Sequence, residues 1–249
     1  MRRVRVIPVL LVAGGQLVKT KKFKNPRYVG DPVNAIRIFS EKGVDELVIC
    51  DISKDRYKNG PDMALIETMA SEAFMPLGYA GGVTTMEQAE GLVSSGVEKI
   101  GLGQSLVDRP GLVKEMVGRY GAQSVVAAVD FKPSLLRGNV QYVESGKRRV
   151  RGSLSTSVQT ALGLGVGELW LTAMEREGTY KGYDTKALES VVLDCPVPVV
   201  IQGGAGSRDD MVTAVEAGAS AVAVGSMFVY QRPHEAVLIS YLKEEITVS

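Results

Sequence analysis

A long internal repeat is the feature that most restricts what this chain can fold into. Residues 43–107 align with residues 165–229 at a constant offset of 122 and without a gap. The identical pairs are Gly43/Gly165, Val44/Val166, Glu46/Glu168, Leu47/Leu169, Gly60/Gly182, Asp62/Asp184, Glu67/Glu189, Pro76/Pro198, Gly81/Gly203, Gly82/Gly204, Val93/Val215, Gly96/Gly218, Gly103/Gly225 and Val107/Val229. Because a repeat over this much of a chain builds the same unit twice, we predict one fold made of two similar halves.

Short β-branched runs alternate with amphipathic stretches along the whole chain. The runs that indicate buried parallel strands lie near residues 5–11, 46–51, 77–80, 98–103, 124–130, 168–173, 198–201 and 221–225. The stretches that indicate helices are 32–42, 62–72, 85–95, 110–119, 155–163, 185–193, 208–217 and 233–244. This alternation predicts an α/β protein, a single (β/α)8 TIM barrel built from two half-barrels. A length of 249 residues suits one such barrel, so a single domain over residues 1–249 is expected.

Local signals support the predicted boundaries. Asp31 followed by Pro32 is typical of an N-cap and a first helical turn, and Gly43 and Gly96 are typical helix stops. The longest strand-to-helix connections are residues 12–31, 52–61, 131–154 and 174–184. Because the loops after the strands form the active site of such barrels, we expect these loops to surround the catalytic mouth.

The composition excludes several classes of protein. A hydrophobic content of 45% and a net charge of +1 argue against disorder and against nucleic acid as a partner. Cys50 and Cys195 are too few for a disulfide framework, so a reduced, cytoplasmic protein is expected. His234 is the only histidine and is predicted to start a helix, so neither a metal site nor a histidine base is expected, and no cofactor is implied.

The N-terminal run MRRVRVIPVLLV is interpreted as the first strand rather than a signal peptide, because Pro8 interrupts it and two glycines follow. No apolar run approaches the roughly 18 residues that span a bilayer, so no membrane association is expected.

Two glycine-rich strand ends predict anion-binding sites. Gly81 and Gly82 end the predicted third strand, and Gly203 and Gly204 end the seventh. Glycine allows backbone amides to approach an anion closely, and a following helix N-terminus adds partial positive charge. Gly103 with Gln104, and Gly225 with Ser226, end the adjacent strands and would complete each site. The pattern predicts a substrate with a phosphate at both ends, the plainer alternative being that these glycines only shape turns.

The starts of four strands bear charged residues on one predicted face. Residues an even number apart on a strand share a face, so the charged residues would point into the barrel with Leu11, Cys50, Gly103 and Thr172. These residues are Arg5, Glu46, Lys99 and Glu168, two cations and two anions. Since buried charges persist when they are paired, a neutral ring in the barrel floor is predicted. The alternative is that the four groups face outward or merely plug the barrel.

Several segments resemble the cyclase subunit of imidazole glycerol phosphate synthase over nearly the whole chain. They are IP at 7–8, LVK at 17–19, GDPV at 30–33, VDELV at 44–48, DIS at 51–53, GVEKI at 96–100, VVAAVD at 125–130, EGTYKGYDT at 177–185 and GGAG at 203–206. The resemblance implies a heterodimer with a glutaminase subunit of the HisH type, docked beneath the barrel. It also implies that Arg5, Glu46, Lys99 and Glu168 gate the passage of ammonia from that glutaminase to the mouth.

The resemblance also assigns residues at the mouth, with departures from the family pattern. Asp130 matches the second of two catalytic aspartates of that family, whereas Leu11 stands where the first is expected. Leucine can neither donate nor accept a proton, so a mechanism with two carboxylates cannot run unchanged. Lys19, Asp51 and Glu177 are implied to organise the substrate, with glutamate 177 in place of an aspartate. The other departures are Gly103-Gln104 in place of an Asn-Thr pair and Gln202 in place of a serine.

A subgroup of that family is more similar still. The missing first-strand aspartate, LVKT at 17–20 and PHEAVLISY at 233–241 resemble cyclase-like proteins of surface polysaccharide synthesis. The resemblance implies delivery of ammonia to a separate sugar amidotransferase, which converts an acetamido group into an acetamidino group in lipopolysaccharide or O-antigen synthesis. The alternatives are a cyclase subunit of histidine biosynthesis that tolerates Leu11, and a non-catalytic scaffold that only activates a glutaminase.

Overall fold

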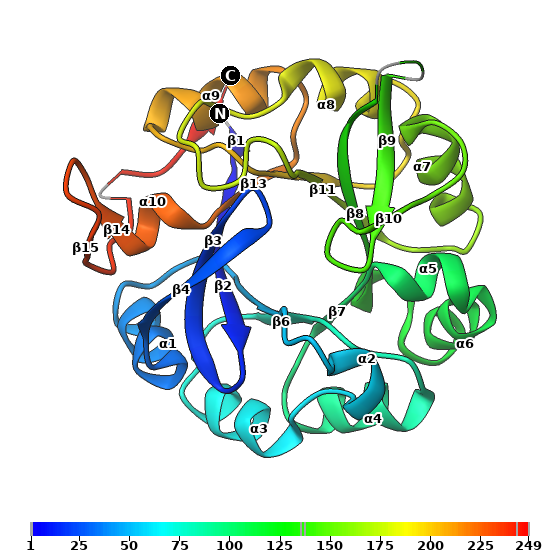
Figure 1. Cartoon of the computed structure of the whole chain (residues 1–249), viewed down its shortest axis with the longest axis horizontal. Helices are drawn as coiled ribbons and strands as arrows, with labels where there is room; N and C mark the ends of the chain where they lie inside the picture. The colour runs from blue at the N-terminus through cyan, green and yellow to red at the C-terminus, as the bar shows by residue number, and fades with distance from the viewer. Residues whose placement is uncertain (1, 135, 137, 243, 249) are drawn as a thin grey trace.

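The computed structural model describes residues 2–134, 136, 138–242 and 244–248. Its centre is a closed ring of parallel strands, in the spatial order β8-β11-β12-β13-β2-β5-β6-β7, with β7 pairing β8 to complete the circle (Figure 1). These strands are β2 (Arg5–Ala13), β5 (Leu47–Asp51), β6 (Leu77–Ala80), β7 (Lys99–Leu102), β8 (Val125–Ser134), β11 (Glu168–Ala173), β12 (Val199–Gln202) and β13 (Ala221–Val224). The predicted α/β barrel is confirmed.

Helices surround the barrel on its outside (Figure 1). The outer helices are α1 (Pro32–Glu41), α3 (Met63–Ser71), α4 (Met86–Ser94), α6 (Pro110–Tyr120), α7 (Leu154–Leu162), α8 (Thr185–Val192) and α9 (Arg208–Glu216). Shorter pieces are α2 (Arg56–Asn59), α5 (Gln104–Asp108), η1 (Ala122–Ser124) and α10 (Ser226–Val229). Asp31 caps α1 through the amide of Asn34 at 2.7 Å, with Pro32 as the first helical residue, as expected from the sequence.

The internal repeat appears in the backbone geometry of both halves. Gly60 and its counterpart Gly182 have φ angles of 75° and 76°, a conformation that favours glycine. Gly43 and Gly96 follow the ends of α1 and α4 with φ angles of 62° and 96°, so both predicted helix stops are confirmed. The sequence repeat therefore corresponds to two half-barrels.

Side chains alternate between two packing layers along each barrel strand. Outward residues such as Leu10, Ile49 and Leu171 join the large core beneath the helices. Inward residues form a smaller cluster on the barrel axis: Ile7, Val9, Leu11, Val18, Val48, Val126, Trp170, Val200, Ala221 and Ala223. The charged and mouth residues that the sequence placed on the inward face share this parity, so the predicted facing is confirmed.

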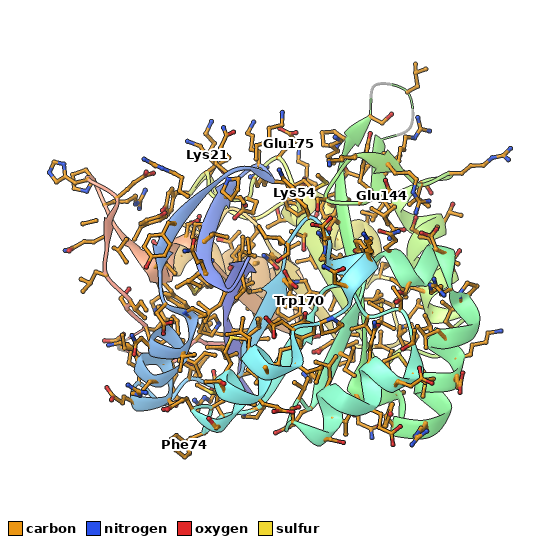
Figure 2. All side chains as sticks on the ribbon, turned by 60° about the horizontal axis from the view of Figure 1, so that its bottom comes forward. Lys21, Lys54, Phe74, Glu144, Trp170 and Glu175 are labelled. Carbon is orange, nitrogen blue, oxygen red and sulfur yellow. The ribbon has the colours of Figure 1, made fainter. Side chains whose placement is uncertain are left out.

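The long connections after β2 and β8 fold into hairpins over the rim. β3 (Gln16–Lys21) pairs antiparallel with β2 and with β4 (Lys24–Gly30). β9 (Gly138–Val143) pairs with β8 and with β10 (Arg148–Arg149). Both hairpins follow the ends of barrel strands, and Figure 2 shows Lys21 of the first hairpin and Glu144 of the second at the same end of the molecule.

The predicted helix over residues 233–244 is wrong. After α10, the chain forms β14 (Tyr230–Gln231) and β15 (Ala236–Val237), and His234 lies in the exposed turn between them rather than at a helix start. The amides of Leu238 and Ser240 donate to the carbonyls of Val229 and Phe228, both at 2.9 Å, instead of to carbonyls within a new helix. Tertiary pairing with α10 has therefore replaced the local helical pattern.

The two ends of the chain meet on the floor side of the barrel. β1 (Arg2–Arg3) pairs antiparallel with β16 (Thr247–Val248), and the amide of Val4 donates to the carbonyl of Ile246 at 2.9 Å. Among the described residues, the structure contains no helix long and apolar enough to cross a membrane.

Candidate functional site

A cavity of about 1140 Å³ opens at the mouth and extends down the barrel axis. Near the mouth it is lined by predicted site residues, namely Leu11, Asp51, Gly81, Gly103, Gln104, Asp130 and Glu177. At its lower end it is lined by Glu46 and Lys99. Figure 2 shows the rim residues Lys54 and Glu144 at one end of the barrel, Trp170 inside it and Phe74 at the opposite end. The cavity therefore joins the predicted mouth to the predicted floor.

Small residues keep the axis open. Gly78, Ala80, Gly101 and Ala128 line the cavity at levels where most barrels of this type have bulky branched side chains. Trp170 is the large exception, and its indole N–H donates to Oε1 of Gln202 at 2.6 Å. This hydrogen bond fixes the ring against the β12 side of the lumen, so Trp170 narrows the passage at mid-height.

The four charged residues at the strand starts form a closed ring. The Nζ atom of Lys99 lies 3.0 Å from a carboxylate oxygen of Glu46 and 2.9 Å from one of Glu168. On the other side, Arg5 is paired with the same two carboxylates. Glu46 and Glu168 are buried, whereas the Arg5 and Lys99 side chains are 35% and 23% exposed. Solvent below the barrel and the cavity above it thus meet at a neutral ring of alternating charge.

Asp130 is the carboxylate at the end of β8, and its surroundings favour the protonated form. Burial raises its pKa to about 6, against the opposing effects of a hydrogen bond with Thr172 and the positive charge of Arg56. Across the lumen stand Leu11 and Cys50, which lie side by side on the neighbouring strands β2 and β5. Burial, followed by the charge of Asp130, raises the pKa of the Cys50 thiol to about 12. The mouth thus has one carboxylate poised near neutrality beside two groups that do not ionise.

Lys19 is a buried cation beneath the β12 and β13 strand ends. Its Nζ atom donates to the carbonyl of Val9 at 2.6 Å. Burial lowers its pKa to about 8, while the negative charge of Glu177 opposes that shift. Glu177 is also buried, which raises its pKa, and one of its carboxylate oxygens accepts from Thr20 at 3.0 Å. The two opposite charges influence each other's pKa without forming an ion pair within 4.0 Å among the described residues.

The second glycine site contains a small closed pocket of about 20 Å³. Its lining includes every residue predicted for this site: Gly203, Gly204, Gly225 and Ser226, together with Glu177. A Cβ atom added to Gly225 would lie 3.0 Å from the Nζ atom of Lys19, so glycine gives this cation room to lie close to the backbone. A glycine-lined pocket and a buried ammonium therefore lie on either side of Gly225, an arrangement suited to an anion.

The first glycine site is built in the same way but is covered by a different loop. A Cβ atom on Gly82 would lie 2.5 Å from the carbonyl oxygen of Arg56, and one on Gly204 would lie 2.0 Å from that of Gly182. In each half, the loop after the preceding strand thus packs directly on the second glycine. Gly81, Gly103 and Gln104 line the large cavity here, whereas Gly82 lies beneath Arg56.

Sequence reasoning missed Arg56, Thr172 and the Trp170–Gln202 hydrogen bond as parts of the site. Arg56 lies within a long loop and shows no periodic or glycine pattern that could have marked it. In the sequence, Thr172 served only to show which face of its strand points inward. In the structure it lies beside Asp130 on the neighbouring strand and forms a hydrogen bond with that carboxylate. Among the described residues, no cluster of three or more histidine, cysteine or acidic side chains could hold a metal ion.

Comparison with known proteins identifies the family. A family model described as histidine biosynthesis protein matches residues 5–234. The chain is 36% identical over 226 residues to imidazole glycerol phosphate synthase subunit HisF of Streptomyces griseus, covering 90% of each protein. The chain belongs to the HisF family of imidazole glycerol phosphate synthase subunits.

Two other relatives with provisional names are more similar to this HisF-family chain. It is 42% identical over 247 residues to a protein of Leptospira interrogans provisionally named subunit HisF, covering 98% of this chain and 97% of that protein. It is 43% identical over 242 residues to the protein provisionally named hisF2 of Pseudomonas aeruginosa, covering 97% of this chain and 96% of that protein. The family resemblance predicted from the motifs is therefore confirmed.

Proposed function

We propose that this HisF-family chain is the synthase-like subunit of a glutamine amidotransferase complex. It receives ammonia from a HisH-like glutaminase below the barrel and conducts it to the mouth, for sugar amidation in lipopolysaccharide or O-antigen synthesis. One observation supports the proposal above all: a neutral ring formed by Arg5, Glu46, Lys99 and Glu168 separates solvent from an open lumen.

The chemistry of the ring suits ammonia. Ammonia is small and uncharged, donates to carboxylates and accepts from an ammonium group. It can therefore replace one Lys99 contact at a time without leaving a buried charge unpaired. Above the ring, the small residues of the lumen offer a path that Trp170 restricts in width. The ring acts as the gate, and Lys99, held through one flexible side chain, is its moving member.

The floor side of the barrel offers a docking surface for the glutaminase. Phe74 and Leu193 are 87% and 85% exposed, although both are large and apolar. They lie in the α3–β6 and α8–β12 connections, which are on the floor side, and Figure 2 shows Phe74 at that end. Exposed apolar side chains around a polar opening are typical of a protein interface.

The mouth supports onward transfer of ammonia rather than cyclisation by two carboxylates. Leu11 occupies the wall position beside Cys50, and neither side chain can exchange a proton near neutral pH. Asp130 remains, with its raised pKa, as the acid–base group of the mouth. Lys19, Asp51, Glu177 and the two glycine sites would hold a phosphorylated small molecule, and a separate sugar amidotransferase would take the ammonia.

Glutaminase stimulation tests the proposal. A purified HisH-like glutaminase should hydrolyse glutamine faster, by tenfold or more, in the presence of this chain. Phe74→Asp should weaken complex formation, whereas Leu136→Asp, an equally exposed apolar residue in the rim turn between β8 and β9, should not. No complex and no stimulation by the wild-type chain would refute the proposal.

A second candidate function is the cyclase reaction of histidine biosynthesis. The observation that favours it is that Asp130 and both glycine sites are retained in a chain of the HisF family. Complementation separates the two functions. If the chain restores growth of a histidine auxotroph that lacks its cyclase subunit, the sugar-amidation proposal loses its main support.

The role of Asp130 separates a catalytic subunit from a scaffold. We expect Asp130→Asn to reduce the amidated sugar product strongly while glutaminase stimulation is retained. Unchanged product formation would instead support a chain that only positions and activates the glutaminase.

A further inference from the structure

Arg56 is a buried cation that forms no ion pair within 4.0 Å among the described residues, and Asp130, on whose pKa its charge acts, lies farther away. It is 9% exposed, and its contacts are with neutral groups. Its guanidinium donates to the carbonyl of Ser53 at 2.6 Å and to the hydroxyl of Ser145 at 2.8 Å. It also stacks on the ring of Tyr57, with 4.5 Å between the guanidinium carbon and the ring centroid. Within the part of the chain that the structure describes, no carboxylate lies within 4.0 Å of it.

This arrangement is incomplete for an arginine. A guanidinium carries five N–H donors, and the two hydrogen bonds above leave others free. Burying a charge is costly unless the charge is paired, so a buried arginine normally faces an anion. Arg56 lines the large cavity, and the anion can therefore come from a bound molecule.

The position of Arg56 points to the first glycine site. Its backbone packs on Gly82, and the cavity beside it is lined by Gly81, Gly103 and Gln104. The side-chain Oε1 atom of Gln104 is buried and has no hydrogen-bond partner among the described residues. Gln104 thus lines this space and carries a buried polar atom without a protein partner, which is unusual.

The second glycine site also has a buried cation beside it. There the buried Lys19 lies against Gly225. At the first glycine site, the buried cation that packs on a glycine is Arg56, whose backbone contacts Gly82. Both cations come from the first half of the chain, Lys19 from β3 and Arg56 from α2, and each lies beside a different pair of glycines.

We propose that Arg56 binds a phosphate group of the substrate at the first glycine site and makes this site selective for a phosphorylated end. The inference rests on the proposed function, because it assumes that the mouth receives a phosphorylated small molecule. The planar fork of a guanidinium matches two phosphate oxygens at once. Because the same side chain bonds Ser145, an occupied site would also hold the 52–61 loop against the β9–β10 turn.

Titration with inorganic phosphate, followed by calorimetry, tests the proposal. The wild-type chain should bind two phosphates, one at each glycine site. Arg56→Met should remove one of them, and Arg56→Lys should weaken that one about tenfold or more while keeping the charge. Arg119→Met, which removes an exposed arginine paired with Glu90 on the outer surface, should leave both sites unchanged. Circular dichroism would confirm that each variant is folded.

The outcomes separate this inference from the proposed function. Two unchanged sites in a folded Arg56→Met variant, or no phosphate binding by the wild-type chain, would overturn the role of Arg56. If the variant loses one phosphate but the wild-type chain fails to stimulate a glutaminase, the proposed function fails and the phosphate role of Arg56 stands.

Discussion

The pKa values of individual residues at the mouth are shifted in the direction that favours the uncharged form of each side chain. Burial is the leading cause for Asp130, with a pKa of about 6, for Lys19, with a pKa of about 8, and for Cys50, with a pKa of about 12. Each shift arises because burial removes water that would stabilise the charged form. The first two groups can therefore exchange protons near neutral pH, which their ordinary pKa values would not allow.

The raised pKa of Asp130 predicts that the free energy of unfolding depends on pH. Its folded-state pKa lies above its ordinary value of 3.8, so the folded state holds the proton more tightly. The free energy of unfolding should therefore fall as pH rises from about 4 to about 6 and stay level above that. Asp130→Asn should raise the stability by about 2 kcal/mol at pH 7.5 and by little at pH 4.

Thermal unfolding of the wild type and Asp130→Asn at both pH values measures this difference. An equal gain at pH 4 and pH 7.5 would show that the carboxylate carries no ionisation cost in the barrel.

The hydrogen bond between Trp170 and Gln202 gives a second prediction for single residues. Gln202→Leu leaves the buried indole N–H without an acceptor and should lower the stability by about 1–3 kcal/mol. Because Trp170 is the only tryptophan, its fluorescence emission should shift in the same variant. Gln159→Leu, on the exposed face of α7, is the control and should change neither signal. Wild-type stability in Gln202→Leu would contradict the assigned bond.

At the scale of elements, the two halves repeat their helix starts as well as their glycines. In α4, the hydroxyl of Thr85 accepts from the amide of Gln88 at 3.3 Å, and the Gln88 side chain bonds back to the amide of Thr85. In α9, Ser207 and Asp210 form the same capping box at the same offset of 122. Each capping box lies at the start of the helix that follows a glycine pair. It therefore fixes the residue at which the helix begins after those glycines.

The capping boxes predict matched losses of stability. Thr85→Ala and Ser207→Ala should each cost about 1 kcal/mol, because each leaves an N-terminal amide without its acceptor. Thr68→Ala, at an exposed position within α3, should cost less than either. Urea unfolding of the three variants is the measurement. A loss in only one half would show that the two half-barrels are not equally dependent on their caps.

At the scale of the whole molecule, the floor ring joins strands from all around the barrel. Arg5 comes from β2 and Lys99 from β7, while Glu168 comes from β11 and Glu46 immediately precedes β5. Sheet hydrogen bonds connect only neighbouring strands, whereas the pairs Arg5–Glu168, Lys99–Glu46 and Lys99–Glu168 connect strands that are not neighbours in the sheet. It therefore serves both the closure of the barrel and the proposed gate.

Because the ring is neutral, removal of one charge should lower the free energy of unfolding. Removal of a second, opposite charge should restore part of it. Lys99→Met leaves Arg5 facing two carboxylates, and we expect a cost of about 2 kcal/mol, since Lys99 is partly screened by solvent. Adding Glu46→Gln restores one cation and one anion, so the double variant should regain part of the loss. Denaturant unfolding of both single variants and the double variant completes the cycle. Purely additive losses would show that the ring members do not interact.

Much of the fold could be predicted from the spacing of residues along the chain and from the residues that start and end helices. The repeat at a fixed offset, the strand parity of Glu46, Lys99 and Glu168, and the helix stops at Gly43 and Gly96 all depend on short-range rules that a linear sequence contains. The helix over 233–244 could not be corrected in this way. Its amides and Tyr241 pair instead with α10 and β2, which lie far away in the sequence or are themselves defined by the fold.

The sequence by itself determined the barrel, its two halves and which residues face the axis, because residue spacing alone fixes facing and period. Only the tertiary structure decided which inward residues meet: the closure of the charged ring, the hydrogen bond between Trp170 and Gln202, and the burial of Arg56 without an ion pair among the described residues. These depend on distances between segments remote in the chain. Burial, which only the closed barrel creates, then sets the pKa values of Asp130 and Lys19.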